Sequence, residues 1–186
     1  MKSETIKLTK RDIEKATEFT TLRTKDSALY QKRGGFKSVD ILTGALGELA
    51  VYRLLKSRSI KTNKPDLTLH TSKSYDSDLT DGTNSYHIKS QSTESVRRYG
   101  ESWLMQRSDP LFKDVPFKQY MIPTVVDLEG GTVEIYGVMN FKTIIEKELV
   151  GECALEWFRK SKVAIYLKDL ETLTWNQRWR KINANT

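Results

Sequence analysis

The chain has 186 residues, 38% of them hydrophobic and 30% charged, and its formal net charge is +7 at pH 7. These values predict one globular domain over residues 1–186, and they are consistent with a polyanionic partner such as a nucleic acid. We expect a cytoplasmic protein without a membrane helix, because no apolar run approaches about 18 residues and the N-terminus lacks a signal-peptide core. The single cysteine, Cys153, excludes an internal disulfide and a cysteine-built zinc site.

The first predicted helix covers Thr9 to about Lys25, with Thr9 as its N-cap and Asp12 in its first turn. The segment Tyr30–Lys37 follows, and its Gly34-Gly35 pair breaks any helix. This segment is either an ordinary loop or a phosphate-contacting loop that uses Lys32, Arg33 and Lys37.

A second amphipathic helix is predicted from Ser38 to about Ser57. Gly44 and Gly47 lie inside it, and each costs about 1 kcal/mol relative to alanine, which indicates a backbone packed very close to a neighbour. Glu48 follows on the same side of the helix as Gly44. A carboxylate there is costly unless it is paired or binds a cation; the alternative is a surface glutamate at the edge of the buried stripe.

A short strand over Pro65–His70 is expected next, followed by a hairpin over Ser74–Gln91 that turns at Asp81–Asn84. Period-2 alternation puts His87, Lys89 and Gln91 on one face of the second strand. Any even-length loop pairs residues whose numbers sum to an odd value, which places two aspartates of the first strand on that face, Asp76 and Asp78. Cross-strand neighbours lie roughly 5 Å apart, so these charges converge, either as a site or as a solvated face of mixed charge.

The remaining chain predicts a short helix within Ser92–Gln106, broken at Gly100, and a second hairpin formed by Gln119–Leu128 and Thr132–Met139. Pro123 argues that the first strand of this hairpin lies at a sheet edge or begins late. Further expectations are a helix over Phe141–Leu149, a helical turn within Glu152–Arg159 and a strand over Lys162–Leu167. The C-terminal segment interleaves aromatic and basic residues, including Arg178, Arg180 and Lys181, and suits either nucleic-acid contact or closure of a core.

The order of these motifs, a helix with Gly44-x-x-Gly47-Glu48 and then a hairpin with Asp78 and His87-Ile88-Lys89, resembles the PD-(D/E)xK nuclease superfamily. The resemblance covers about Ser38 to Gln91. It implies an α/β fold with a mixed central β-sheet flanked by helices, a restriction-endonuclease-like core. It also implies that Glu48, Asp78 and the Ile88 carbonyl hold Mg²⁺, while Lys89 orients the attacking water or offsets charge on the phosphate.

His87 departs from this pattern, because it occupies the position of the usual acidic residue and imidazole is a poor Mg²⁺ ligand. Three alternatives follow: a weaker single-metal site, a preference for Mn²⁺, or His87 as a base with Asp76 as the second carboxylate. We favour Asp76 or a one-metal site over His87 as a magnesium ligand. Asp78 is preferred over Asp66 and Asp76 as the main ligand.

The function predicted from the resemblance is a Mg²⁺- or Mn²⁺-dependent endonuclease acting on DNA. The alternatives are a non-catalytic nucleic-acid-binding module on a nuclease scaffold and an RNA-directed nuclease. A homodimer is left open, since a duplex has two strands to cut. Gln91 is expected either to hold a water or phosphate oxygen or to be an ordinary polar strand residue. Substrate contacts are predicted for Arg97, Arg98, Tyr99 and Trp103, with a packed Trp103 as the rival interpretation.

Overall fold

The protein, seen here as a computed structural model that describes residues 3–25, 38–69, 77–113 and 118–174, has an α/β fold. Its central feature is a mixed six-stranded sheet with the strand order β1-β6-β5-β3-β2, in which β7 also pairs with β5. The strands of this sheet are β1 Glu4–Lys7, β2 Leu79–Thr80, β3 Ser85–Ser92, β5 Gln119–Asp127, β6 Thr132–Ile135 and β7 Met139–Asn140. The predicted α/β fold with a mixed sheet flanked by helices is therefore confirmed, while the restriction-endonuclease-like core stays a prediction.

A second, three-stranded sheet and the helices complete the fold. The small sheet has the order β4-β9-β8, with β4 Ser102–Gln106, β8 Gly151–Glu152 and β9 Lys162–Tyr166. The helices are α1 Lys10–Lys25, α3 Ser38–Ser57, α4 Thr93–Tyr99, α5 Phe141–Glu146 and α6 Leu167–Leu170, with 3₁₀ turns η1 Pro110–Phe112 and η2 Glu156–Phe158. None of the helices in the described ranges is both long and apolar enough to cross a membrane.

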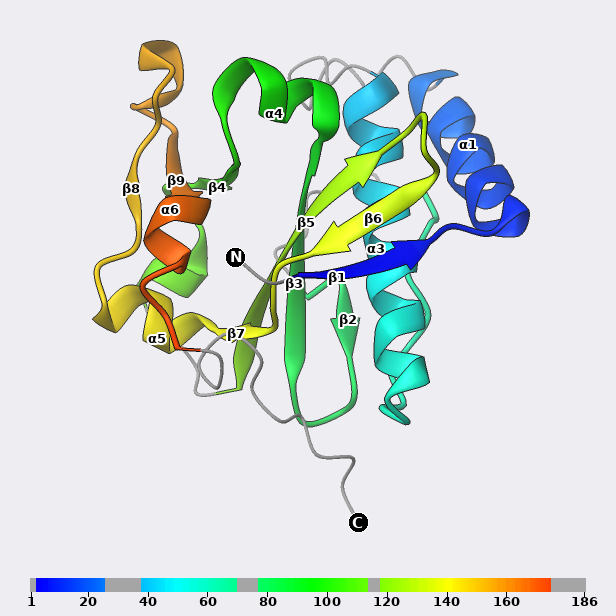
Figure 1. Cartoon of the computed structure of the whole chain (residues 1–186), viewed down its shortest axis with the longest axis horizontal. Coiled ribbons are helices and arrows are strands. Elements are labelled where there is room, and N and C mark those ends of the chain that lie inside the picture. Colours follow the sequence, from blue (N-terminus) through cyan, green and yellow to red (C-terminus); the bar gives the residue numbers. More distant parts are fainter. Residues whose placement is uncertain (1–2, 26–37, 70–76, 114–117, 175–186) are drawn as a thin grey trace.

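The central sheet separates two hydrophobic cores. Helices α1 and α3 cover one face, drawn on the right in Figure 1, and α3 buries Leu46, Leu49 and Leu54 against Ile122 and other strand residues. The small sheet, α5 and α6 lie on the other side of the central sheet, where Trp103, Phe141 and Ile165 pack with Met121 and Val125 of β5. Strand β5 thus contributes alternate side chains to both cores, as period-2 alternation requires.

Helix α1 begins with the predicted cap. The Thr9 backbone N–H donates to Asp12 Oδ2 at 2.9 Å, and the Asp12 N–H donates to Thr9 Oγ1 at 3.2 Å, which is a reciprocal capping arrangement. Arg53 of α3 donates to the same Asp12 oxygen at 3.0 Å and to the Lys7 carbonyl at 2.7 Å. Burial alone would raise the Asp12 pKa, but the Thr9 hydrogen bonds and the Arg53 charge outweigh it and lower that pKa. One arginine therefore joins α3 to the β1–α1 connection.

The expected edge position of the strand that carries Pro123 was wrong. Strand β5 is central and runs parallel to β3, with Pro123 in register with Lys89. The Pro123 carbonyl accepts from Tyr136 N–H at 3.0 Å, just where β6 has ended and β7 has not begun. Because the N and the C=O of one strand residue point to the same side, the missing proline donor faces this break in the neighbouring strand. A proline is therefore tolerated in the middle of the sheet.

Two other local predictions were wrong. Residues 65–69 form no strand, because the Asp66 side chain accepts from Thr68 N–H at 3.1 Å and holds a local turn. The helix after Asn140 ends at Glu146 rather than Leu149. In contrast, the helical turn expected within Glu152–Arg159 is present as η2, although Glu152 itself belongs to β8. Helix α4 ends as expected at Gly100, whose φ of +73° favours glycine.

Candidate functional site

The site is built where α3 lies directly on the sheet, and Gly47 makes this approach possible. A Cβ added at Gly47 would stand 2.0 Å from Ser90 Oγ of β3 and 3.0 Å from Thr124 Oγ1 of β5. These two hydroxyls hydrogen-bond to one another at 2.9 Å beneath the helix. The close packing inferred from the helix glycines is thus present at Gly47, whereas no described atom lies within 4 Å of a Cβ at Gly44. The next residue, Glu48, lies within electrostatic reach of Asp78 and of Lys89 on β3.

The opposite wall of the site is the β2–β3 hairpin, which forms around the predicted turn. The Asp81 N–H donates to the Asn84 carbonyl at 3.2 Å, and Gly82 has a φ of +86°. Leu79 pairs with Tyr86, so the paired residue numbers sum to an odd value as expected. The sequence therefore predicted both the turn and the register of this short ladder.

Asp78 leaves that register by one residue. Its backbone N–H donates to the Tyr86 carbonyl at 3.0 Å, although the register partner of Tyr86 is Leu79. Two residues of one strand opposite a single residue of the other form a β-bulge, which re-aims side chains and is over-represented near active sites. The Asp78 carboxylate turns towards β3 and accepts from the Ile88 N–H at 2.6 Å. The Asp78 carboxylate thus accepts the hydrogen bond that a backbone carbonyl of a paired strand would otherwise accept from Ile88, and Asp78 does not stand opposite His87.

Glu48, Asp78 and Lys89 act on one another electrostatically, and we call these three residues the carboxylate–lysine cluster. Burial raises the pKa of Glu48 well above its usual value, and the neighbouring Asp78 carboxylate raises it further, while the Lys89 ammonium opposes both effects. Burial also raises the pKa of Asp78, against the opposing effects of Lys89, the Ile88 N–H and His87. Two like charges in a partly buried place are costly. A cation beside them would lower that cost.

Two more charged residues act on the cluster. Arg23, near the end of α1, lowers the pKa of Glu48, and Asp66, in the irregular segment before the hairpin, raises it. No role for Arg23 was predicted from the sequence. A signal for it exists, since Arg23 follows the buried Ala16 and Phe19 at the spacing of one helix face. Asp66 was considered there only as an alternative ligand, and it stands in the surroundings of Glu48 with its side chain exposed.

The donor set fits a hard divalent cation in part. The Asp78 carboxylate lies within electrostatic reach of Glu48, and the Ile88 carbonyl points to the same side of β3 as the Ile88 N–H, beyond the end of the β2–β3 ladder. Carboxylate and carbonyl oxygens are ligands that Mg²⁺ accepts while it keeps several waters. Within the described residues no group of three or more His, Cys, Asp or Glu residues assembles. The chain thus offers two carboxylates and a carbonyl, and Asp76 lies outside the described residues.

His87 lies on the opposite face of β3 from Ile88, in register with Met121 of the second core. The side chain is 6% exposed, and its Nε2 lies 2.7 Å from Oε1 of Gln119. With the amide oxygen as acceptor, Nε2 carries the proton. The Nε2 atom is therefore already hydrogen-bonded to Gln119 of β5, which leaves Nδ1 as the other ring nitrogen.

The Gln91 side chain is fully engaged with protein groups. Its Nε2 donates to the Gly100 carbonyl at 3.0 Å and to Ser95 Oγ at 3.4 Å, and its Oε1 accepts from the Ser102 N–H at 3.0 Å. It is 8% exposed. These contacts hold the turn between α4 and β4, so Gln91 acts as a structural clamp in this fold, and we leave it out of the proposed catalytic group.

Trp103 was predicted to contact substrate, and that prediction was wrong. The side chain is 1% exposed, and its indole N–H donates to the Thr124 carbonyl at 2.9 Å. Its alternation in β4 points it into the second core, where Tyr136 lies 5.5 Å away between ring centroids. The packed alternative is the correct one.

The other predicted nucleic-acid contacts divide into two groups. Arg97, Arg98 and Tyr99 lie exposed on the last turn of α4, where Arg98 forms an ion pair with Glu94. The remaining predicted contacts lie outside the described residues: Lys32, Arg33, Lys37, Arg178, Arg180 and Lys181. Their role stays a prediction.

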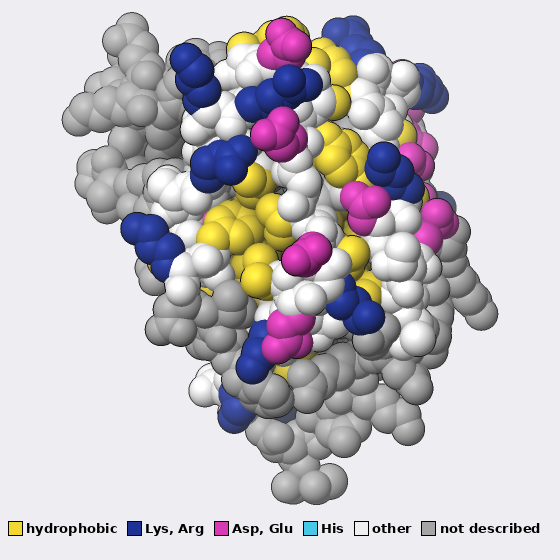
Figure 2. All heavy atoms as spheres, turned by 90° about the vertical axis from the view of Figure 1, so that its left-hand side faces the viewer, with side chains coloured by type: hydrophobic (Ala, Val, Ile, Leu, Met, Phe, Trp, Pro, Cys, Tyr) yellow, Lys and Arg dark blue, Asp and Glu magenta, His cyan; other side chains and the backbone are white. Residues whose placement is uncertain are grey.

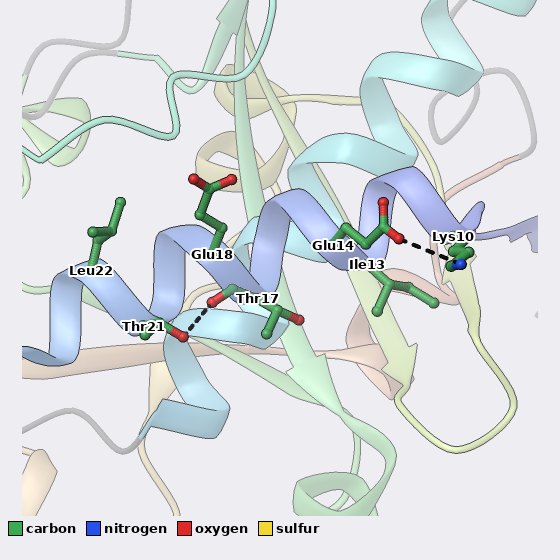
Figure 3. Close-up of a pocket in the computed structure, with 7 residues that line it drawn as sticks. All are labelled: Lys10, Ile13, Glu14, Thr17, Glu18, Thr21 and Leu22. Carbon is green, nitrogen blue, oxygen red and sulfur yellow. Dashed lines mark hydrogen bonds and ion pairs between the residues drawn. The ribbon is translucent and has the colours of Figure 1, made fainter.

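A shallow hollow on the surface lies elsewhere and does not include the cluster. Figure 3 shows that its lining side chains all come from the outer face of α1, among them the exposed Ile13 and Leu22. Lys10 and Glu14 form an ion pair along this face at 3.8 Å, and Thr21 donates to the Thr17 carbonyl at 2.8 Å. Among the described residues, one helix alone lines the hollow and brings no groups from other elements to it, so the cluster is the better candidate for a functional site.

Comparison of the chain with protein-family models, with curated protein sequences and with solved structures finds no match.

Proposed function

We propose that this chain is a metal-dependent endonuclease that hydrolyses phosphodiester bonds in DNA. The observation that carries the proposal is the carboxylate–lysine cluster, in which burial raises the pKa values of Glu48 and Asp78, the Asp78 carboxylate raises that of Glu48 further, and Lys89 opposes both shifts. Strongly perturbed carboxyl groups next to a lysine are typical of functional sites. The net charge of +7 supports a polyanionic substrate. We further propose a cytoplasmic location, in keeping with a chain whose single cysteine forms no internal disulfide.

The protein groups divide the work in this proposal. Glu48, Asp78 and the Ile88 carbonyl would hold Mg²⁺ or Mn²⁺, which supplies Lewis-acid stabilisation of charge on the phosphate and activation of a water nucleophile. The Ile88 N–H holds Asp78 in place through its 2.6 Å hydrogen bond, so the bulge orients one ligand. Lys89 contributes a point charge that attracts a phosphate oxygen and orients the attacking water. Arg23 adds a second cation within electrostatic reach of Glu48.

The test is cleavage of plasmid and single-stranded DNA with Mg²⁺ or Mn²⁺ by the wild type and by Lys89→Ala, Glu48→Gln and Asp78→Asn. We expect each variant to lose at least about 100-fold in rate, the lower range for removal of one essential charged group. Lys56→Ala is the matched control, because Lys56 is an exposed lysine in the last turn of α3, and it should cleave like the wild type. Equal cleavage by wild type and Lys89→Ala would reject the assignment.

The same assay separates the alternatives. Tight DNA binding without cleavage under either ion would favour a non-catalytic binding module, an outcome that the histidine at the usual acidic position makes worth testing. Competition between DNA and RNA substrates of equal length would identify an RNA-directed nuclease. The elution volume of the protein in size-exclusion chromatography would test the homodimer.

A further inference from the structure

The connection between β8 and β9 presents a tryptophan to solvent. Trp157, in η2, is 71% exposed, whereas tryptophan is on average a highly buried residue. The turn that carries it is well defined, because Phe158 N–H donates to the Leu155 carbonyl and Ser161 N–H to the Phe158 carbonyl, both at 3.0 Å. The neighbouring Phe158 ring lies 6.1 Å from the Trp157 ring between centroids. An indole is therefore held outward on an ordered turn and keeps most of its surface in solvent.

Basic side chains gather around the residues that follow Trp157. Lys162 Nζ lies 4.5 Å from the centre of the Phe158 ring, and Arg107 at the end of β4 donates to the Arg159 carbonyl at 3.0 Å. Burial raises the pKa of the nearby Cys153 thiol, and Lys162, Arg107 and Arg159 all act to lower it. Three cations thus converge on the same small region from two strands and a turn.

Acidic residues neutralise only part of this charge. Glu152 and Glu156 lie 3.9 Å and 3.7 Å from Arg159, and all three side chains are largely exposed, so these ion pairs are weak. Arg107 and Lys160 are exposed and have no carboxylate partner in the described part of the chain. Figure 2, which views the molecule from the side of the small sheet, shows basic side chains interspersed with acidic ones around exposed hydrophobic side chains on this face. We call Arg107, Trp157, Arg159 and Lys160 the aromatic–basic tip.

We propose that the aromatic–basic tip is a stacking platform for an unpaired base of single-stranded DNA, with Trp157 on the base and Arg107 and Lys160 on the flanking phosphates. This inference rests on the proposed function, which makes DNA the substrate. It adds that the tip recognises DNA in its single-stranded form. An exposed ring beside cations is the combination that single-strand binding proteins use, because every base has a stacking face and every nucleotide a phosphate.

The tip suits an unpaired base better than a duplex or a protein surface. In a duplex both faces of each base are already stacked, so the indole would have to open a base step at a cost of a few kcal/mol. A stable protein interface buries about 800 Å² per partner, and here one indole is exposed beside a half-buried phenylalanine among charges. Size and charge therefore both favour a nucleotide.

The experiment measures binding of fluorescently labelled single-stranded and duplex oligonucleotides to the full chain in chelator, so that cleavage plays no part. Stacking on one aromatic side chain contributes about 1–3 kcal/mol per base, so Trp157→Ala should weaken single-strand binding by about fivefold to a hundredfold. Duplex binding should change much less, and Trp157→Phe should keep most of the affinity. Leu22→Ala is the control, because Leu22 is also an exposed hydrophobic residue, at 49%.

Salt dependence tests the cations separately. Arg107→Gln and Lys160→Gln should each reduce the slope of log K against log salt by about 0.7, the value for one phosphate contact of a single strand. Unchanged single-strand affinity of Trp157→Ala would overturn the proposal. So would a Trp157→Ala effect confined to self-association in size-exclusion chromatography, because it would identify a second protein chain as the partner.

The outcomes also distinguish this proposal from the nuclease proposal. If Trp157→Ala weakens single-strand binding and no form of the protein cleaves, the platform stands and the nuclease assignment fails. Cleavage that depends on Lys89, together with an unaffected Trp157→Ala, would have the opposite meaning. A chain that binds no oligonucleotide in chelator and cleaves none with Mg²⁺ or Mn²⁺ would reject both.

Discussion

Among single residues, Glu48 is the one whose ionisation in the folded state costs free energy in a way that experiment can measure. Its carboxyl group is partly buried beside a second carboxylate, and its pKa is raised well above the usual value. A folded-state pKa above the unfolded one means that the folded state binds more protons, so the free energy of unfolding falls as pH rises between the two values. The protein should therefore lose stability on going from the unfolded pKa of about 4.3 up through the raised pKa of Glu48.

Glu48→Gln should remove much of that loss. Its free energy of unfolding should exceed the wild-type value above the raised pKa, by about 1.4 kcal/mol for every tenfold difference between the acid dissociation constants of the folded and unfolded states. Below about pH 4.3 the two proteins should have similar stabilities. Denaturant unfolding at a series of pH values measures both, with Glu18→Gln on the exposed side of α1 as the control.

The effect of divalent ions on stability tests the proposed role of Glu48 as a metal ligand. Mn²⁺ should raise the unfolding temperature of the wild type, because an ion that binds only the folded state stabilises it, and Glu48→Gln should lose most of this response. A wild type whose stability rises over the same pH range would contradict the raised pKa of Glu48, and a Glu48→Gln variant that responds fully to Mn²⁺ would contradict its role as a ligand.

Among the elements, α3 carries two glycines that the structure uses differently. Gly47 touches the Ser90 and Thr124 hydroxyls, whereas a Cβ at Gly44 meets no described atom within 4 Å. The same substitution in the same helix should therefore have opposite effects. This contrast makes the two glycines a matched pair.

Gly44→Ala should stabilise the protein by up to about 1 kcal/mol through helix propensity. Gly47→Ala should destabilise it by about 1–3 kcal/mol, because the added methyl overpacks the helix–sheet contact. Denaturant titration measures both changes. Ser90→Ala should recover part of the loss in the Gly47→Ala background, and the lack of any coupling between these two substitutions would contradict the close approach.

Across the molecule as a whole, β5 connects the two cores. Ile122 and Val126 enter the core under α3, and Met121 and Val125 enter the core beneath the small sheet. Neither core can lose its packing without disturbing a strand that the other needs. The two should consequently unfold together.

Leu54→Ala in the first core and Ile165→Ala in the second should each cost about 2–5 kcal/mol and shift one common transition. Far-UV circular dichroism reports mainly α1 and α3, and the fluorescence of the buried Trp103 contributes a signal from the second core, so the two curves should coincide. Leu22→Ala should change stability by less than about 0.5 kcal/mol. Two separate transitions would show that the expected single domain divides into two units.

Local patterns predicted a substantial part of this fold. The Thr9–Asp12 cap, the hairpin at Asp81–Asn84 and the alternation of β3 each depend on residues within a few positions of one another, and the structure has all three. The close approach at Gly47 was also indicated, because a glycine inside a helix costs free energy that only tight packing repays. Its contact partners, Ser90 and Thr124, lie far away in sequence and were not predicted.

The failures share a physical cause. Pro123 is tolerated in a central strand only because β6 ends opposite it, and Trp103 is buried only because β4 joins the small sheet on the far side of β5. Arg23 reaches the surroundings of Glu48 through the packing of α1 on α3. Each depends on how distant segments pack, which propensity and periodicity do not encode.

From the residues alone it follows that a glycine-bearing helix with Glu48 precedes a charged hairpin with Lys89, since helix and turn preferences act between near neighbours. Which of those charges meet depends on the folded arrangement. A bulge turned Asp78 towards the Ile88 N–H, the second face of β3 directed His87 to Gln119, and α4 with β4 engaged Gln91. The reason is that pairing between distant strands and helices is set by burial of the two cores, which fixes side-chain directions only after the whole sheet has assembled.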